Sequence, residues 1–369
     1  MILSPEESRS HQTTFGQLLV ALMVAVAWLA VTLLPLSGVV GADEAPGLDA
    51  HIYLAMAEAP TVFTMPPYAY RLGVPLLAHL LPFSLELNFF LLTCIGLLVT
   101  LILGYVLFRQ LGYSHGLALL GMSFVAAAPE VTVYLGNHFL VDPLALALMI
   151  ALFIAIEREV SAGPIALLLL IASLFKETAF FVIPVLYLRL AGPRFVDRGA
   201  AWRVLLISAP AVIAALTLRF AWGGGFDAFP YLSPWEGQRQ PWYGSIGAYQ
   251  AVWSGLFGYL GLLAIVNAFS ERWRSFVRCY LPYAALVVAQ LLVPQNSERL
   301  LFFAFPVIIP LALAEFQRIR DELPDWFPLL TILLVVCYVF LPGQLAPPMV
   351  LVILGRLLIE RRRPARGSA

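Results

Sequence analysis

The feature that most constrains this chain is the recurrence of uncharged apolar stretches along its whole length. A helix that crosses the roughly 30 Å hydrocarbon core of a bilayer needs about 20 apolar residues. Lipid offers no hydrogen-bond partners to the backbone, so such stretches must form helices. Only 12% of the residues are charged and 61% are hydrophobic, whereas a soluble domain carries about 25% charged residues. The sequence therefore predicts an all-α, polytopic transmembrane bundle.

The uncharged stretches predict about 11–12 spans within a single transmembrane domain, residues 1–369. The first is too long for a signal peptide and follows a flank that is not basic, so we expect it to be retained. Two short stretches around Lys176 either meet at a thinned or cavity-lined external edge or form one kinked span. The expected spans are residues 16–40, 85–108, 116–135, 139–156, 164–175, 177–190, 204–222, 246–267, 279–294, 300–316, 326–342 and 347–360.

Basic residues predict the orientation of these spans. With the amino terminus inside, seventeen of the 22 basic residues fall on the inner side, in accord with the positive-inside rule. Residues 1–15 and the basic segment 361–369 are then cytoplasmic tails, and the latter is a membrane anchor rather than a nucleic-acid site. Scarce lysine and the lack of eukaryotic targeting signals favour a bacterial inner membrane. The basic residues expected outside are Arg71, Lys176, Arg219, Arg239 and Arg299.

Two external loops are expected, at residues 41–84 and 223–245. The first contains several acidic residues, the stretch "PPYAYR" and then "LGVPLLAHLLP", which is too short to span and predicts a helix in the interface. The second is rich in aromatic residues, typical of either a sugar-stacking lid or an interfacial belt. The cysteines, Cys94, Cys279 and Cys337, lie in apolar stretches and are expected to be small core residues.

Polar residues gather where spans meet on the predicted outer side. Ionisable groups at membrane depth are expensive and usually face a cavity or each other, whereas the inner junctions are arginine-rich and otherwise plain. This pattern predicts an outward-facing site, although an ion pair between helix ends explains each group alone equally well. The candidates are Asp43, Asp49, Tyr70, Arg71, His138, Asp142, Lys176, Glu177 and Arg299.

The layout of these motifs resembles the GT-C superfamily of integral-membrane glycosyltransferases, which use polyprenyl-phosphate sugars. The matching stretches span about residues 16–310: "LDAHIYLAMAEA" in the first external loop, "PYAYRLGVPLLAHLLP" after it, then "FKET" and "SERLLFFAFPVIIP". The "YR-x-x-x-PLL" core is similar to a segment of mannosyltransferases of glycosylphosphatidylinositol synthesis. The chain departs from many members in lacking a large soluble external domain.

The resemblance implies roles for these residues. The first-loop aspartate of the family is the general base, and Asp49 matches best because "D-x-x-x-Y" follows, with Asp43 as the competitor. Lys176 would hold the carrier phosphate, helped by Arg71 and Arg299, and Glu177 would orient Lys176 or contact sugar hydroxyls. The alternative is that Lys176 and Glu177 pair with Asp142 or Arg299 to tie helix ends together.

The expected partners are therefore a polyprenyl-phosphate sugar donor, a lipid or glycan acceptor and membrane lipids, without nucleic acid. No cofactor is expected, because the first loop lacks the strongly acidic metal motifs of oligosaccharyltransferases. A divalent ion held by His51, His138 and Asp49 is the lesser alternative. The competing functions are an O-antigen polymerase or ligase, which usually has a larger late external loop, and a secondary transporter, which should show inverted repeats and broken helices.

Overall fold

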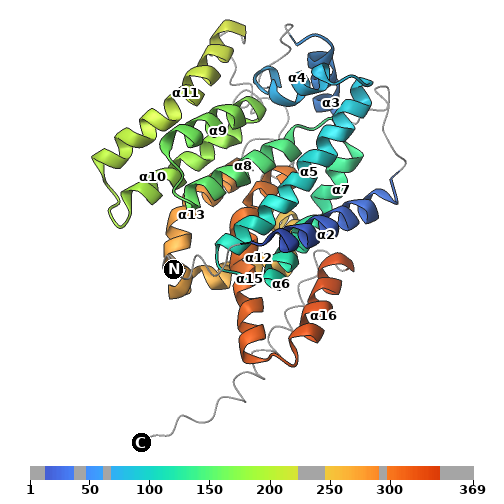
Figure 1. Cartoon of the computed structure of the whole chain (residues 1–369), viewed down its shortest axis with the longest axis vertical. Coiled ribbons are helices and arrows are strands. Elements are labelled where there is room, and N and C mark those ends of the chain that lie inside the picture. Colours follow the sequence, from blue (N-terminus) through green and yellow to red (C-terminus); the bar gives the residue numbers. More distant parts are fainter. Residues whose placement is uncertain (1–12, 37–46, 61–67, 223–245, 291–296, 341–369) are drawn as a thin grey trace, which may run out of the picture.

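The computed structural model describes residues 13–36, 47–60, 68–222, 246–290 and 297–340, and this part of the chain is helical, without strands (Figure 1). The all-α prediction is therefore confirmed for these residues. The helices are α2 (Phe15–Leu33), α3 (Gly47–Glu58), η2 (Tyr68–Tyr70), α4 (Gly73–Leu80), α5 (Leu85–Gln110), α6 (His115–Ala126), α7 (Pro129–Gly136), α8 (Asp142–Glu157), α9 (Ala162–Phe175), η3 (Glu177–Val182), α10 (Ile183–Ala191), α11 (Arg198–Trp222), α12 (Ile246–Ala268), η6 (Glu271–Trp273), α13 (Arg274–Ala289), α14 (Ser297–Leu301), η8 (Phe302–Ala304), α15 (Phe305–Glu322) and α16 (Phe327–Phe340).

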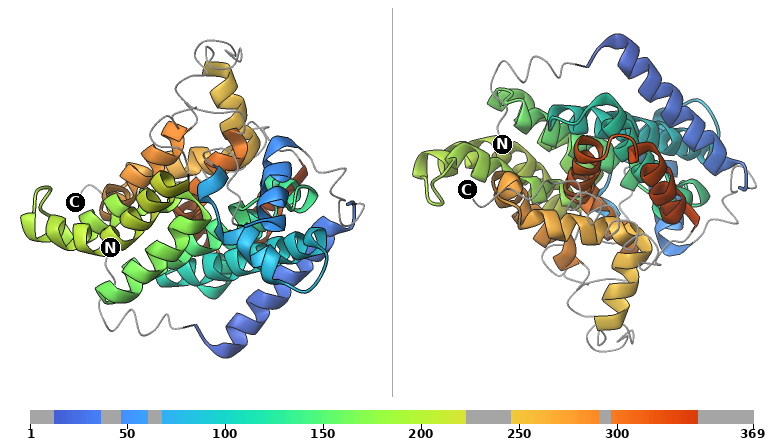
Figure 2. Two further views of the ribbon diagram at one scale, coloured as in Figure 1. Left: turned by 90° about the horizontal axis from the view of Figure 1, so that it is seen from above. Right: turned by 90° about the horizontal axis from the view of Figure 1, so that it is seen from below.

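Several helices expose their apolar side chains at the periphery. In the apolar window of the span Arg299–Glu322, which includes α15, 89% of residues are buried, against 17% in α2 and 22% in α11. Figure 2 shows α2 and α11 at the outer edge of the molecule in both views. Long apolar helices that expose leucine, valine and phenylalanine side chains are typical of spans that face lipid, so the chain is a membrane protein, with α15 near its centre.

In the described part of the chain, fewer helices than the sequence predicts are long and apolar enough to cross a bilayer. Among the described residues, five helices are long and apolar enough to cross a bilayer: Phe15–Leu33, Leu85–Gln110, Arg198–Phe220, Ala251–Ala268 and Arg299–Glu322. The expected span 116–135 is not one straight helix, because α6 and α7 are bent by 51° at their junction. This pair makes a sixth span if it is counted as one.

The remaining expected spans that fall in the described part of the chain form shorter helices. At 1.5 Å per residue, the 14 residues of α9 cover only about 21 Å, and α8, α13 and α16 are similar. The expected total of 11–12 spans is therefore not confirmed. Parts of the spans at 16–40, 279–294 and 326–342, and all of 347–360, lie outside the described residues, as does the loop 223–245.

The two short stretches around Lys176 form a hairpin. Lys176, at the end of α9, contacts Asp142 at the start of α8. Arg189, near the end of α10, pairs with Glu157 at the other end of α8. Because α8 runs from Asp142 to Glu157, η3 and α10 return along the direction opposite to α9. The two stretches therefore meet at Lys176 and do not form one long kinked span.

The described part of the first loop contains two α-helices, α3 and α4, with the short 3-10 helix η2 between them, where the sequence predicts one helix. The expected interfacial helix is α4, whereas α3 was not expected (Figure 1). Both pack on the start of α5 and the turn before α8, through a core of buried residues. The side-chain amide of Asn88 on α5 donates to the carbonyls of Ala78 and Leu81, at 2.8 and 3.0 Å. These contacts fix α3 and α4 against one end of the helix bundle.

The opposite end of the bundle is rich in arginine. Arg109 and Arg158 lie at the ends of α5 and α8, and Arg158 donates to Gln110. Arg278 on α13 donates to the carbonyl of Gly192 after α10, and Arg320 on α15 donates to Ser114 before α6. These four of the arginines expected on the inner side thus lie at the end away from α3 and α4.

Candidate functional site

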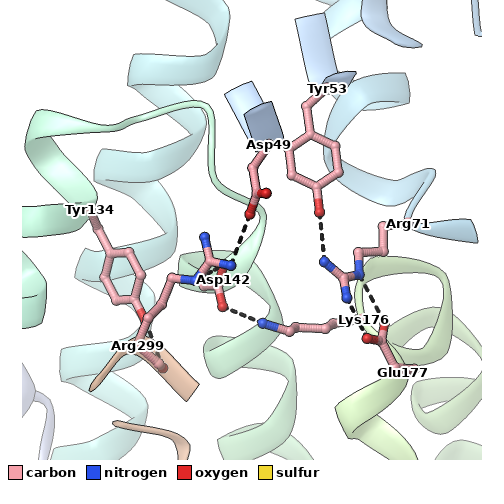
Figure 3. A network of polar contacts seen from close by, with 8 residues as sticks. All are labelled: Asp49, Tyr53, Arg71, Tyr134, Asp142, Lys176, Glu177 and Arg299. Carbon is pink, nitrogen blue, oxygen red and sulfur yellow. Dashed lines mark hydrogen bonds and ion pairs between the residues drawn. The ribbon is translucent and has the colours of Figure 1, made fainter. Parts of the chain in front are cut away.

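Five separate segments meet at the α3 end of the bundle and bring a network of charged and phenolic side chains together (Figure 3). The segments are α3, η2 with the residue after it, the end of α7 with the start of α8, the α9–η3 junction, and α14. The network consists of Asp49, Tyr53, Arg71, Tyr134, Asp142, Lys176, Glu177 and Arg299. We refer to these eight residues as the polar network.

The centre of the polar network is a buried ion pair. The ammonium of Lys176 donates to Oδ1 of Asp142, and the two side chains are only 1% and 2% exposed. Lys176 has an extended backbone between α9 and η3, which turns its side chain back toward α8. The Phe303 ring centroid lies 4.8 Å from the ammonium nitrogen. Lys176 therefore holds the start of α8 and the α9–η3 junction together.

Arg299 connects this pair to α3. Its Nη2 donates to Oδ2 of Asp49 at 2.9 Å, and its Nε lies 3.8 Å from Oδ2 of Asp142. The backbone carbonyl of Arg299 accepts a hydrogen bond from the Tyr134 hydroxyl at 3.4 Å. The side chains of Asp49 and Arg299 are partly exposed, unlike the ion pair beneath them. A molecule that approaches this end of the bundle therefore meets Asp49 and Arg299 before Lys176.

Asp49 lies in the first turn of α3, where the positive end of the helix dipole favours a carboxylate. The neighbouring Tyr68 contributes a hydroxyl that interacts with this carboxylate. Burial, together with the negative charge of Asp49 and this hydrogen bond, raises the pKa of Tyr68 to about 12. Tyr68 is therefore a neutral hydrogen-bond donor at physiological pH, and Asp49 is held by a cation and a phenol.

Arg71 forms the second ion pair of the polar network. Its Nε donates to Oε2 of Glu177 at 2.9 Å, and its Nη2 donates to Oε1 of the same carboxylate. The remaining Nη1 donates to the Tyr53 hydroxyl at 2.9 Å. The Tyr68 ring centroid lies 5.5 Å from the guanidinium carbon. The guanidinium plane is thus fixed by two tyrosines and a carboxylate.

The structure brings together six of the nine candidates from the sequence: Asp49, Arg71, Asp142, Lys176, Glu177 and Arg299. His138 is not in the network, because its ring packs against Phe90 and Phe139, with centroids 5.6 and 4.5 Å away. The Tyr70 ring instead lies 5.2 Å from the guanidinium of Arg219 on α11. Asp43 lies outside the described residues.

The pairing of Lys176 with Asp142 is the one that the helix-tying alternative predicts. Glu177 instead pairs with Arg71, which neither interpretation named. Sequence reasoning also missed Tyr53 and Tyr134. The "D-x-x-x-Y" spacing places Asp49 and Tyr53 on one face of a helix, but only once α3 is recognised as helical.

The metal alternative finds no support in the described part of the chain. His51 is exposed on α3, and His138 is buried among aromatic rings. No group of three or more histidine, cysteine, aspartate or glutamate side chains is arranged to hold a metal ion among the described residues.

No model of a known protein family matches the chain, and no curated protein sequence matches it. The chemistry of the polar network is therefore argued from its geometry. It contains three carboxylates and three cations, which balance in charge. Asp49 is a partly exposed carboxylate that pairs with Arg299, whereas Arg71 pairs with Glu177.

Proposed function

We propose that the chain is an inverting membrane glycosyltransferase that moves a sugar from a polyprenyl-phosphate donor to a lipid or glycan acceptor. In this proposal, the polar network faces the outside of a bacterial inner membrane. The observation that carries the proposal is the position of Asp49, a partly exposed carboxylate beside Arg299 at one end of a membrane bundle. Glycosyl transfer from a lipid phosphate needs a proton acceptor and fixed cations close together.

In the reaction, Asp49 accepts the proton of the acceptor hydroxyl while the hydroxyl oxygen attacks the anomeric carbon. The bond between that carbon and the phosphate oxygen breaks, and its electron pair stays on the phosphate. The phosphate thereby changes from a singly charged diester to a more highly charged monoester. Cations placed near the developing charge stabilise this step, and Arg71 and Arg299 are the nearest ones to the partly exposed side of the polar network.

In this proposal Lys176 does not contact the phosphate directly. Its ammonium is buried and bonded to Asp142, so it supports the site by neutralising this carboxylate. Because Lys176 already neutralises Asp142, the positive charge of Arg299 is free to act on Asp49 and the substrate. Removal of Lys176 is expected to act on the position of Arg299 as well as on stability.

The test is sugar transfer by the Asp49→Asn variant in membranes supplied with a panel of radiolabelled polyprenyl-phosphate hexoses and pentoses. The amide cannot accept the proton, so we expect transfer to fall by about 10²–10⁴-fold. Glu58→Gln, an exposed position on the same helix, is the matched control and should retain wild-type transfer. Wild-type rates in Asp49→Asn, with normal expression, would contradict the assignment of Asp49.

A transporter is the second candidate because of one observation. The bend between α6 and α7 and a kink in α12 at Gly258, where φ is +51°, border a cavity of about 310 Å³. Discontinuous helices of this kind form substrate sites in secondary transporters. A flux assay in sealed vesicles separates the two functions: solute accumulation without any glycosylated product would favour transport.

A further inference from the structure

The ion pair between Arg71 and Glu177 is asymmetric in its exposure. The Arg71 side chain is 8% exposed and the Glu177 side chain is 50% exposed. Arg71 is fixed by the buried Tyr53 hydroxyl and by the Tyr68 ring, in addition to Glu177. Because Glu177 is already half in solvent, rotation of its side chain away from Arg71 is less costly than any movement of Arg71. Glu177 is therefore the partner that can leave.

Departure of Glu177 uncovers two parallel N–H donors. The Nε and Nη2 of Arg71 both point at the carboxylate oxygens in a bidentate arrangement. The guanidinium fork that fits a carboxylate also fits two oxygens of a phosphate. The Tyr53 and Tyr68 contacts keep the guanidinium in place when the carboxylate leaves. The vacated position is thus suited to a phosphate group.

The net charge of the polar network also favours a phosphate at this position. Its three cations, Arg71, Lys176 and Arg299, are balanced by Asp49, Asp142 and Glu177. Of these three carboxylates, Asp142 is buried and Asp49 is only 15% exposed. Without Glu177 the network carries one net positive charge. A phosphodiester carries one negative charge and would replace the carboxylate one for one.

We propose that Glu177 is a built-in substitute for the phosphodiester of a lipid-linked donor, which it blocks from the Arg71 fork until the donor displaces it. This inference rests on the proposed function, since it assigns the carrier phosphate to Arg71. Glu177 begins η3 and follows the extended Lys176, so it can move at a helix junction while Lys176 stays on Asp142. The Glu177 carboxylate thereby competes successfully with anions that bind weakly. A lipid-linked phosphodiester can displace it, because its lipid chain adds binding energy.

The test measures binding of farnesyl methyl phosphate, a singly charged prenyl phosphodiester, to the purified full chain in dodecyl maltoside by titration calorimetry. Glu177→Gln keeps the shape and removes the charge, so we expect about tenfold tighter binding, which corresponds to about 1.4 kcal/mol. Arg71→Gln should bind more weakly than wild type, and adding Glu177→Gln to it should give no gain. Glu271→Gln, an exposed glutamate at the opposite end that pairs with Arg274, should bind like wild type.

Unchanged or weaker binding by Glu177→Gln, or a gain that persists without Arg71, would overturn the proposal. Glu177→Asp is the second variant: it retains the charge but is too short for the same fork, and it should also bind more tightly than wild type. Inorganic phosphate is titrated in parallel, and equal affinity for it would contradict a lipid-linked ligand. The assay contains neither sugar nor acceptor, so its outcome is independent of the Asp49→Asn transfer assay.

Discussion

At the scale of single residues, the buried pair of Lys176 and Asp142 has the largest expected effect on stability. Lys176→Met leaves the carboxylate of Asp142 buried, with Arg299 at 3.8 Å as its remaining cation. Breaking a buried ion pair by removing one partner destabilises proteins by about 3–5 kcal/mol. We expect a loss of this size in the free energy of unfolding, measured by denaturant titration in detergent.

Two comparisons make this prediction specific. Lys176→Met with Asp142→Asn removes the uncompensated charge, so the double variant should recover part of the loss. Arg274→Ala breaks an exposed pair with Glu271 and should cost at most about 1 kcal/mol. Equal losses in Lys176→Met and Arg274→Ala would show that the Lys176–Asp142 pair contributes no more than an ordinary surface contact.

Sequence reasoning found six members of the polar network because charged side chains gather in the first loop and where spans meet on one predicted side. It named Asp142 as one alternative partner of Lys176 but missed the pair of Arg71 and Glu177, which are 106 positions apart in the chain. Tyr53 and Tyr134 were missed for a physical reason. In the sequence, a tyrosine that donates a hydrogen bond within a polar network is flanked by the same kinds of residues as a tyrosine of an interfacial belt.

At the scale of helices, the sequence located α5, α8 and α9 to within three residues, because polar or charged residues end their apolar stretches, whereas α11 begins six residues before the expected span 204–222. It missed α3, which has no long apolar stretch and is recognisable only from residues with high helix propensity. It also missed the bend between α6 and α7. Pro129 marks that bend as the first residue of α7, but membrane helices also contain proline without breaking.

Close packing of α5 against α8 depends on Gly96. A Cβ atom at this position would lie 2.9 Å from the backbone nitrogen of Leu144 and the carbonyl carbon of Pro143. Alanine favours a helix over glycine by about 1 kcal/mol, yet Gly96→Ala must separate two backbones. We expect it to lower the thermal midpoint and to shift the start of α8, which carries Asp142.

Gly104, two turns further along α5, is the matched control. Its added Cβ would meet only the Phe305 ring, at an ordinary contact distance of 3.9 Å. Gly104→Ala should therefore leave the thermal midpoint unchanged or raise it, as helix propensity predicts. A similar increase in both variants, measured by thermal unfolding in detergent, would show that α5 and α8 are less tightly packed than the structure indicates.

At the scale of the whole molecule, polar groups divide between two ends. The end formed by α3 and α4 contains the polar network, whereas the ends of α5, α8, α10 and α15 contribute arginines to the opposite end. This separation follows from a chain that passes back and forth along the bundle, and the sequence predicted it through the distribution of basic residues. The network end should face outward, because positively charged ends remain in the cytoplasm.

Cysteine accessibility tests this orientation in a chain whose native Cys94, Cys279 and Cys337 are replaced by alanine. Glu58 lies exposed on α3, and Arg194 lies exposed beside the end of α10. A membrane-impermeant maleimide should label Glu58→Cys in intact cells and Arg194→Cys only in inverted membrane vesicles. Both positions are exposed, so a difference in labelling reports the side of the membrane and not burial. The reverse pattern would place Asp49 and Arg299 in the cytoplasm and contradict transfer on the outer side, whereas labelling of both from one side would contradict the two-ended arrangement itself.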